Sequence, residues 1–205
     1  MVVLNIIGQG LSVLPPIPDN VTELLCGNNN LTELPPLPPA LEKLGCSRNK
    51  LTALPDLPLT LEALGCNSNE LTALPVLPPT LTHLWCSNNQ LTALPNLPPT
   101  LEVLSCSNNQ LTALPNLPPT LSVLSCENNQ LTSLPDLPPR LSRFVCINNR
   151  FPPDLQAILD RYARNLPQLI ISVNQYNAQK LKLRRQMGRN IAVSYTHLTL
   201  PTILR

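Results

Sequence analysis

The sequence repeats itself every 20 residues, and this period constrains the possible folds more than any other feature of the chain. Consecutive units follow one another without an insertion, starting at Leu14, Leu34, Leu54, Leu74, Leu94, Leu114 and Leu134. Residues 1–13 form a preceding half unit with the same spacing. A period of this length predicts a stack of similar units in which each unit contacts only its neighbours.

Each unit contains the pattern L-x-x-L-x-C-x-x-N-x-L, as in residues 101–111. Apolar and polar residues alternate from Leu104 to Cys106, as they do in a half-buried β-strand. One such strand cannot bury its apolar side alone, but stacked copies form a parallel sheet with about 4.8 Å per step. The pattern resembles that of leucine-rich repeats, so we predict a leucine-rich-repeat solenoid over residues 1–153, with a parallel β-sheet on its concave face.

The chain has 25 prolines, and most lie in the return stroke of each unit, as in Leu94-Pro-Asn-Leu-Pro-Pro99. Proline fixes φ and offers no backbone N–H, so these segments do not favour an α-helix. We expect an extended, Pro-rich convex side. A role as a ligand for proline-binding domains is the alternative, and the need for the leucines in the core disfavours it.

One asparagine and one cysteine recur at fixed positions of every unit. The asparagines are Asn29, Asn49, Asn69, Asn89, Asn109, Asn129 and Asn149. The cysteines are Cys26, Cys46, Cys66, Cys86, Cys106, Cys126 and Cys146. A buried amide can donate and accept hydrogen bonds at the bend that follows the strand, so the asparagine column is expected to be structural.

The cysteine spacing argues against metal and disulfide chemistry. The chain contains no C-x-x-C pair, and its 7 cysteines cannot all pair within one chain. We predict buried free thiols, no metal and no cofactor. Free thiols favour a reducing, intracellular compartment.

The outward positions of the predicted strands vary while their neighbours repeat, so we expect a partner to bind there. The candidate partner-binding residues are Glu23, Lys43, His83, Trp85, Val103, Val123, Glu127, Arg143 and Val145. Trp85 is the only tryptophan, and it either anchors a partner or lies flat over Gly65. His83 is expected to be an ordinary surface residue. The face has no catalytic triad, carboxylate pair or phosphate-binding glycine loop, so we predict a non-catalytic scaffold.

The charge changes after the repeats. Residues 1–153 carry 10 acidic and 6 basic residues, a formal charge of −4, and residues 154–205 carry 2 acidic and 8 basic residues, a charge of +6. We predict a helical cap and basic tail over residues 154–191, with Asp154 capping a first helix and a second helix over residues 168–187. Binding of nucleic acid or an anionic surface by this tail is disfavoured, and no membrane span is expected.

Residues 192–205 differ from the rest of the chain and resemble a tail that recurs at the ends of unrelated translated draft sequences. We therefore treat this segment as non-native or artefactual. It takes no part in the functional argument.

The repeat is similar to the short, 20-residue bacterial leucine-rich repeats of type III-secreted effectors of the YopM/IpaH class. That resemblance implies a curved solenoid that binds a partner protein on its concave sheet. Some members carry a cysteine-dependent ubiquitin ligase domain, so the alternative function is the substrate-recognition arm of such a ligase. No cysteine follows Cys146, however, and the ligase nucleophile has no counterpart here. The compartment would be the bacterial cytoplasm, or the host cytoplasm for a secreted effector.

Overall fold

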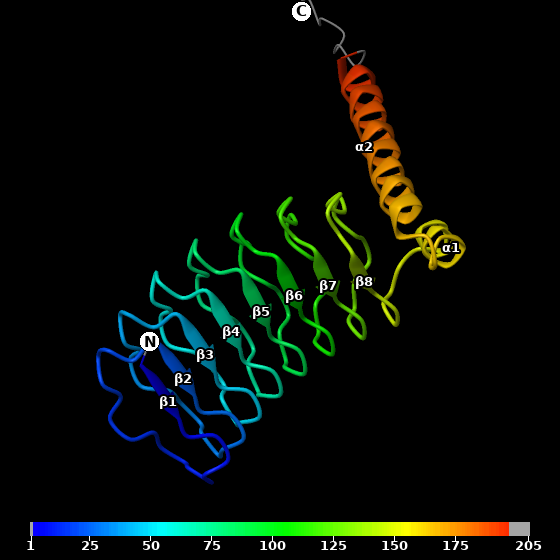
Figure 1. The fold of residues 1–205 in the computed structure, drawn as a ribbon. Coiled ribbons are helices and arrows are strands. Elements are labelled where there is room, and N and C mark those ends of the chain that lie inside the picture. The colour runs from blue at the N-terminus through cyan, green and yellow to red at the C-terminus, as the bar shows by residue number, and fades with distance from the viewer. Residues whose placement is uncertain (1, 197–205) are drawn as a thin grey trace, which may run out of the picture.

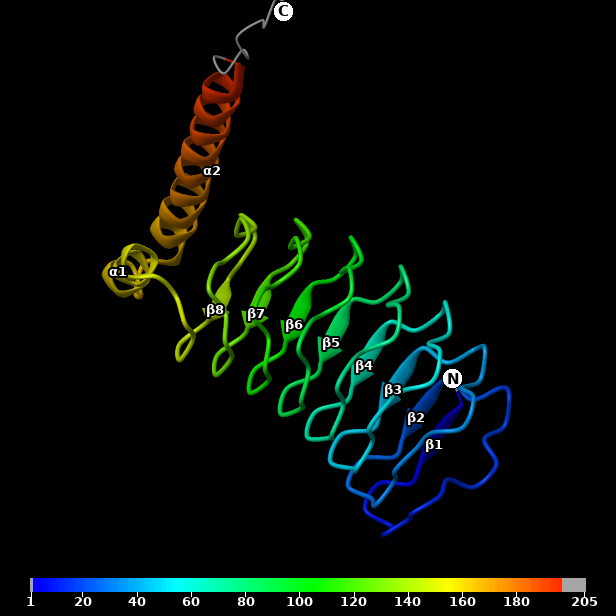
Figure 2. The same ribbon diagram turned by 180° about the vertical axis from the view of Figure 1, so that it is seen from behind.

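The computed structural model describes residues 2–196 and forms a solenoid whose turns stack side by side (Figures 1 and 2). The eight strands are β1 (Val3–Asn5), β2 (Glu23–Leu25), β3 (Lys43–Gly45), β4 (Ala63–Gly65), β5 (His83–Trp85), β6 (Val103–Ser105), β7 (Val123–Ser125) and β8 (Arg143–Val145). They form one parallel sheet in the order of the sequence. Two helices follow, α1 (Pro153–Arg161) and α2 (Leu166–Thr196).

Neighbouring strands pair in a register of one full repeat, so equivalent residues lie side by side. Leu84, for example, pairs with Leu104, and Leu104 pairs with Leu124. The 20-residue period therefore becomes a set of parallel side-chain columns across the sheet. The predicted leucine-rich-repeat solenoid and its parallel sheet are confirmed.

The core is built from leucine columns and the cysteine column. In one central unit Leu101, Leu104, Cys106 and Leu111 are each 0% exposed. A fully buried leucine contributes about 2 kcal/mol relative to an exposed one. The seven cysteines are free and buried, as predicted.

The asparagine column holds successive turns together, as the sequence predicts. The side-chain Nδ2 of Asn109 donates to the carbonyl oxygens of Cys86 and Cys106, each at 3.1 Å. Its Oδ1 accepts the backbone N–H of Leu91 at 3.0 Å. One amide thus satisfies backbone groups of two turns that the three-residue strands leave unpaired.

A left-handed residue precedes each of these asparagines, and sequence reasoning did not predict it. The residues are Asn28, Arg48, Ser68, Asn88, Asn108, Asn128 and Asn148, with φ between 53° and 58°. This backbone region disfavours most side chains, and asparagine tolerates it better than most. The Asn-Asn pair that recurs in the sequence is the signal that could have revealed the bend.

Replacing Arg48 by asparagine is therefore expected to stabilise the protein by about 0.5 kcal/mol, because asparagine relieves backbone strain that arginine does not. Urea unfolding at neutral pH measures this as a higher midpoint with an unchanged slope. Lys50→Asn is the matched control, because exposed Lys50 lies outside the left-handed column. Equal midpoints for the two variants would contradict the strain argument.

The return strokes contain no α-helix within residues 2–150, in agreement with the proline argument. Each stroke ends in a turn in which the N–H of a leucine, or of Val21 in the first unit, donates to a proline carbonyl oxygen, as from Leu101 to Pro98 at 3.1 Å. Figure 2 shows these strokes as extended segments without helical coils.

The two helices cover the end of the stack beside β8 (Figure 1). Asn174 on α2 donates to the carbonyl oxygen of Leu137 at 3.0 Å, and its Oδ1 accepts the N–H of Leu137 at 2.8 Å. Leu137 is only 1% exposed, whereas the equivalent Leu117 is partly buried. The helices therefore bury the last turn, as a terminal cap does in a solenoid.

The predicted helix starts need correction. Asp154 does not cap α1, because the N-cap position is Pro152 and Asp154 lies in the first turn. The second helix starts at Leu166, two residues earlier than predicted, since Pro167 fits the first turn of a helix. The Oδ1 of Asn165 accepts the N–H of Gln168 at 3.2 Å and caps this start.

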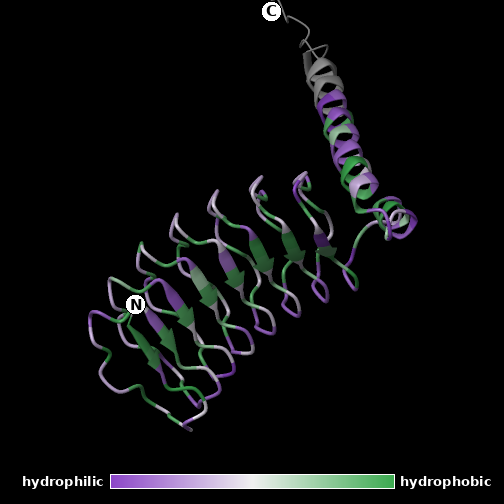
Figure 3. Ribbon diagram, viewed as in Figure 1, coloured by the Kyte–Doolittle hydropathy of each residue, from purple (hydrophilic) through white to green (hydrophobic). Residues whose placement is uncertain are grey.

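The second helix also continues to Thr196, beyond the predicted end at residue 187. The segment predicted to be artefactual thus begins inside α2, and its residues 197–205 lie outside the described part of the chain. Within the described residues, neither helix combines the length and the apolar character that a membrane span requires. Figure 3 shows polar and apolar residues interspersed along the coloured part of α2.

Candidate interaction surface

The first and third residues of β2–β8 form one face of the sheet, here called the outer sheet face. Their central leucine or phenylalanine points the other way, into the core. Eight of the nine candidate residues occupy these strand positions. They are Glu23, Lys43, His83, Trp85, Val103, Val123, Arg143 and Val145. The alternation that the sequence predicted therefore gathers these eight on one face.

Glu127 belongs to a different column, the residue after each cysteine. Glu127 was predicted to lie at an outward position, but its column does not face outward throughout, because Ser87 and Ser107 are only 8% and 4% exposed. The side chain of Ser87 links neighbouring turns, because its Oγ accepts the backbone N–H of Ser107 at 3.1 Å and lies 2.8 Å from the Oγ of Ser105. The chain already turns inward here, because the next residue adopts the left-handed conformation.

Glu127 is the one acid in this column, and it lies close to the core. Within the described residues, its Oε2 and the Oγ of Ser107 are buried and have no hydrogen-bond partner. Burial raises the pKa of the Cys106 thiol to about 12, and the negative charge of Glu127 adds to this effect, while a backbone hydrogen bond lowers it. The carboxylate therefore helps to keep the neighbouring thiols protonated.

A hollow of about 370 Å³ lies on the outer sheet face over β2–β5. It is lined by Glu23, Leu25, Lys43, Leu44, Gly45, Ala63, Gly65, His83 and Trp85. Gly45 pairs with Gly65 in the sheet, and Gly65 pairs with Trp85. The two glycines contribute no side chains to the floor of the hollow. Leu25 leans over Gly45, where a Cβ would lie 3.1 Å from its Cδ2, and Trp85 stands on the other side. The hollow exists because Gly45 and Gly65 have no side chains to fill it.

The ring of Trp85 is held by His83 rather than by the glycine floor. The two ring centroids are 5.3 Å apart, with the planes tilted by 35°. The Nδ1 of His83 is 2.8 Å from the hydroxyl oxygen of Thr82, which fixes the imidazole. A Cβ built on Gly65 would have Ser47, Leu44 and Gly45 as its nearest neighbours. The indole therefore does not lie flat over Gly65, and the hollow beside it stays open.

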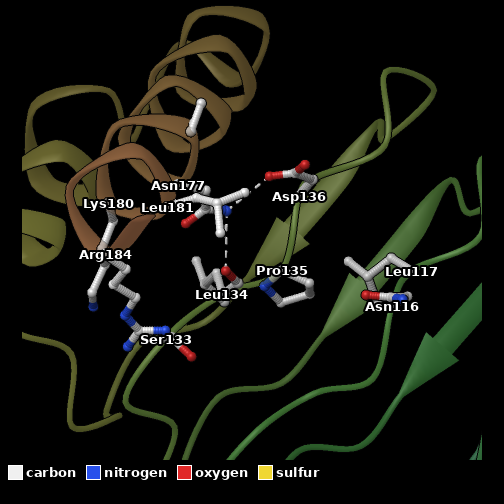
Figure 4. Close-up of a pocket in the computed structure, with 11 residues that line it drawn as sticks. Asn116, Leu117, Ser133, Leu134, Pro135, Asp136, Asn177, Lys180, Leu181 and Arg184 are labelled. Carbon is white, nitrogen blue, oxygen red and sulfur yellow. Dashed lines mark hydrogen bonds between the residues drawn. The ribbon is translucent and has the colours of Figure 1, made fainter. Parts of the chain in front are cut away.

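A larger cavity of about 780 Å³ lies between α2 and the return strokes of the last two units (Figure 4). Asn177 bridges it at one end, where its Nδ2 donates to Leu134 O at 3.2 Å and to Asp136 Oδ1 at 3.0 Å. Lys180 and Arg184 line the helix side, and the Lys180 ammonium also sits 5.6 Å from the ring centroid of Tyr176. These contacts belong to the attachment of the cap.

No group of three or more metal-binding side chains occurs within the described part of the chain. The burial of the thiols likewise favours a structural role. Burial raises the pKa of Cys66 to about 12 and that of Cys46 well above its ordinary value. Such thiols are protonated at neutral pH and are poor nucleophiles and metal ligands.

The repeat geometry defines a class of protein, the leucine-rich-repeat solenoids. Residues 79–119 and 99–139 match the family model described as Leucine Rich repeats (2 copies). No curated protein matches the chain.

Solved structures of bacterial proteins share the fold. YopM from Yersinia enterocolitica WA-314 is 44% identical with a TM-score of 0.68, over 68% of this chain and 31% of the YopM chain. A Shigella effector leucine-rich-repeat domain is 34% identical with a TM-score of 0.73, over 80% of this chain and 76% of that domain. The functional domain of InlJ from Listeria monocytogenes, which includes a cysteine ladder, is 28% identical with a TM-score of 0.54, over 72% of this chain and 39% of that one.

The chain belongs to the bacterial leucine-rich-repeat family that includes the repeat domains of these effectors. It spans less than a third of the length of the Yersinia enterocolitica YopM chain.

Proposed function

We propose that the chain is a non-catalytic protein-interaction module that binds a partner protein on its outer sheet face, centred on the hollow beside Trp85. The hollow carries this proposal, because it combines an open floor, a positioned aromatic ring and a mixed polar rim. Aromatic residues in such pockets provide much of the binding energy in protein interfaces.

The distribution of variable residues supports the same proposal. The columns that repeat in every unit are used for the core and for the hydrogen bonds between turns. The outer sheet face instead differs from strand to strand, from Lys43 and Gly45 in β3 to Val103 and Ser105 in β6. Residues that the fold does not require are free to recognise a partner. The similarity to bacterial effectors also favours an interaction scaffold.

The alternative is the substrate-recognition arm of a ubiquitin ligase. Such a ligase uses a cysteine nucleophile, and the thiols of this chain are buried, with pKa values raised by that burial. A ligase activity would therefore need a nucleophile that this sequence does not supply. In this alternative, too, the outer sheet face would hold the substrate.

The free cysteines bear on the cellular compartment in which the protein acts. Seven free cysteines are compatible with a reducing environment. We infer the bacterial cytoplasm, or the host cytoplasm if the protein is a secreted effector like its relatives.

A photo-cross-linker tests the proposed face directly. We replace Ala63, which lines the hollow, by p-benzoylphenylalanine and irradiate the protein in bacterial and mammalian lysates. Val76, 85% exposed on the return stroke, carries the same group in the matched control. We expect a discrete adduct at position 63 and none at position 76, measured by denaturing electrophoresis and mass spectrometry.

Trp85→Ala in the position-63 protein is expected to lower the adduct yield about thirtyfold, because a central aromatic anchor contributes about 2 kcal/mol. Far-UV circular dichroism checks that this variant keeps its fold. Equal yields at positions 63 and 76, or an adduct that persists in folded Trp85→Ala, would refute the assignment of the surface.

A further inference from the structure

We propose that the hollow receives an apolar side chain from a partner segment that carries lysine or arginine beside it. This inference rests on the proposed function and specifies the chemistry of the partner. It uses two separate observations, the shape and lining of the hollow and the charge of the face around it.

The lining favours a single apolar side chain. Leu25, Ala63 and Trp85 contribute apolar surface, and the backbone of Gly45 and Gly65 forms the floor. The volume of about 370 Å³ lies near the lower end of ligand-binding pockets. A leucine, methionine or phenylalanine side chain could contact the indole and the glycine floor at once, and so displace water from both.

The charge around the hollow is predominantly negative. A second column, here called the entry column, consists of the residue just before each strand from β2 to β8. Its members are Thr22, Glu42, Glu62, Thr82, Glu102, Ser122 and Ser142. Over β2–β5, where the hollow lies, the entry column and the outer sheet face carry Glu23, Glu42 and Glu62 against Lys43, a net formal charge of −2.

The hydrogen bonds of the sheet fix the spacing of the entry column. The backbone N–H of Glu62 donates to Glu42 O at 2.8 Å, and the N–H of Thr82 donates to Glu62 O at 2.8 Å. Adjacent members are therefore one strand spacing apart, about 4.8 Å. Like charges on neighbouring strands repel each other, so a cation placed between Glu42 and Glu62 relieves this repulsion as it binds.

The two features lie next to each other in the chain. Glu42 directly precedes Lys43, and Glu62 directly precedes Ala63, and both of these neighbours line the hollow. A cationic residue adjacent to the inserted apolar residue can therefore reach the entry column. An acidic segment would meet repulsion at the same place, so charge provides the selectivity.

A displayed library of random twelve-residue peptides tests the proposal without a known partner. We expect selection on the wild-type protein to enrich peptides with an aliphatic or aromatic residue flanked by lysine or arginine. Trp85 is the only tryptophan, so its fluorescence measures binding of a synthesised enriched peptide at the hollow itself.

Three variants separate shape, charge and fold. Gly65→Leu fills the hollow, and its Cβ meets no atom closer than 3.6 Å, so the sheet can accept it. The triple variant Glu42→Gln, Glu62→Gln and Glu102→Gln removes the charge but keeps the side-chain shape. Val76→Ser, on the return stroke, is the matched control.

We expect Gly65→Leu to weaken binding of the enriched peptide at least tenfold, the triple variant to weaken it at least fivefold at low salt, and Val76→Ser to leave it unchanged. Enrichment of acidic or uncharged peptides on the wild-type protein would overturn the proposal. So would selection on Gly65→Leu that enriches the same peptides to the same extent as selection on the wild type. If an adduct still forms at position 63 after such a result, the interaction surface stands and only the partner chemistry proposed here is wrong.

Discussion

Raising the pH from 9 to 10 is expected to unfold the protein cooperatively, because seven thiols are buried in the protonated form. Burial raises the pKa of Cys26 from 9.0 to about 11 and that of Cys66 to about 12. The folded state therefore keeps these protons while the unfolded state loses them above pH 9. Stability is fully present below pH 9 and falls as the pH rises toward the folded values.

The expected effect is large. Between pH 9 and 10 each buried thiol lowers the free energy of unfolding by about 1 kcal/mol, so seven thiols lower it by roughly 7 kcal/mol. This is similar to the whole stability of an ordinary domain, about 5–15 kcal/mol. Urea unfolding under reducing conditions, followed by circular dichroism at several pH values, measures the slope.

Removing three thiols provides the control. The triple variant Cys46→Ala, Cys66→Ala and Cys86→Ala should be less stable at pH 7, because three small cavities form in the core. Its loss of stability between pH 9 and 10 should nevertheless be smaller than that of the wild type, by about three sevenths. A stability independent of pH in this window would mean that the thiols are accessible to solvent.

Asn109→Ala is expected to destabilise the protein by about 3–5 kcal/mol, because it removes several buried hydrogen bonds at once. The side chain donates to the carbonyl oxygens of Cys86, Cys106 and Ser107, at 3.1, 3.1 and 3.2 Å. It also accepts the N–H of Leu91 at 3.0 Å. Alanine leaves the N–H of Leu91 without a partner in the interior. Each of the three carbonyl oxygens loses one of its two donors and keeps the other, from Asn89, Asn129 and the N–H of Asn88. The free energy of unfolding in urea at pH 7 measures the loss.

The neighbouring residue gives a matched comparison. Asn108 is exposed and left-handed, so Asn108→Gly keeps the backbone conformation and should change the stability by less than about 1 kcal/mol. A similar loss in both variants would show that the bend itself, rather than the buried amide of Asn109, determines stability.

Sequence periodicity predicted the sheet, its register and the buried columns, because a strict repeat leaves one stacking arrangement that buries every leucine. It predicted the outward position of Trp85 for the same reason. It did not predict the hollow, because Gly45 and Gly65 gave no signal until the register placed them side by side. Nor did it identify Glu42 and Glu62, whose column lies just outside the alternating strand.

The helix boundaries and the column after each cysteine were less predictable for physical reasons. The start of α2 depends on the amide of Asn165 and on the tolerance of the first turn for Pro167. The burial of Ser87 and Ser107 depends on a backbone bend at the next residue, which the alternation of apolar and polar residues does not encode.

Each strand has only three residues and pairs only with its immediate neighbours, so the stability of the solenoid depends on contacts between adjacent turns. One part of such a solenoid can therefore unfold locally while distant turns stay folded. A ligand that contacts β2 through β5 would couple these four turns, so that they unfold together. Occupation of the hollow would then slow the hydrogen exchange of backbone amides throughout these four turns, including amides that the ligand itself does not contact.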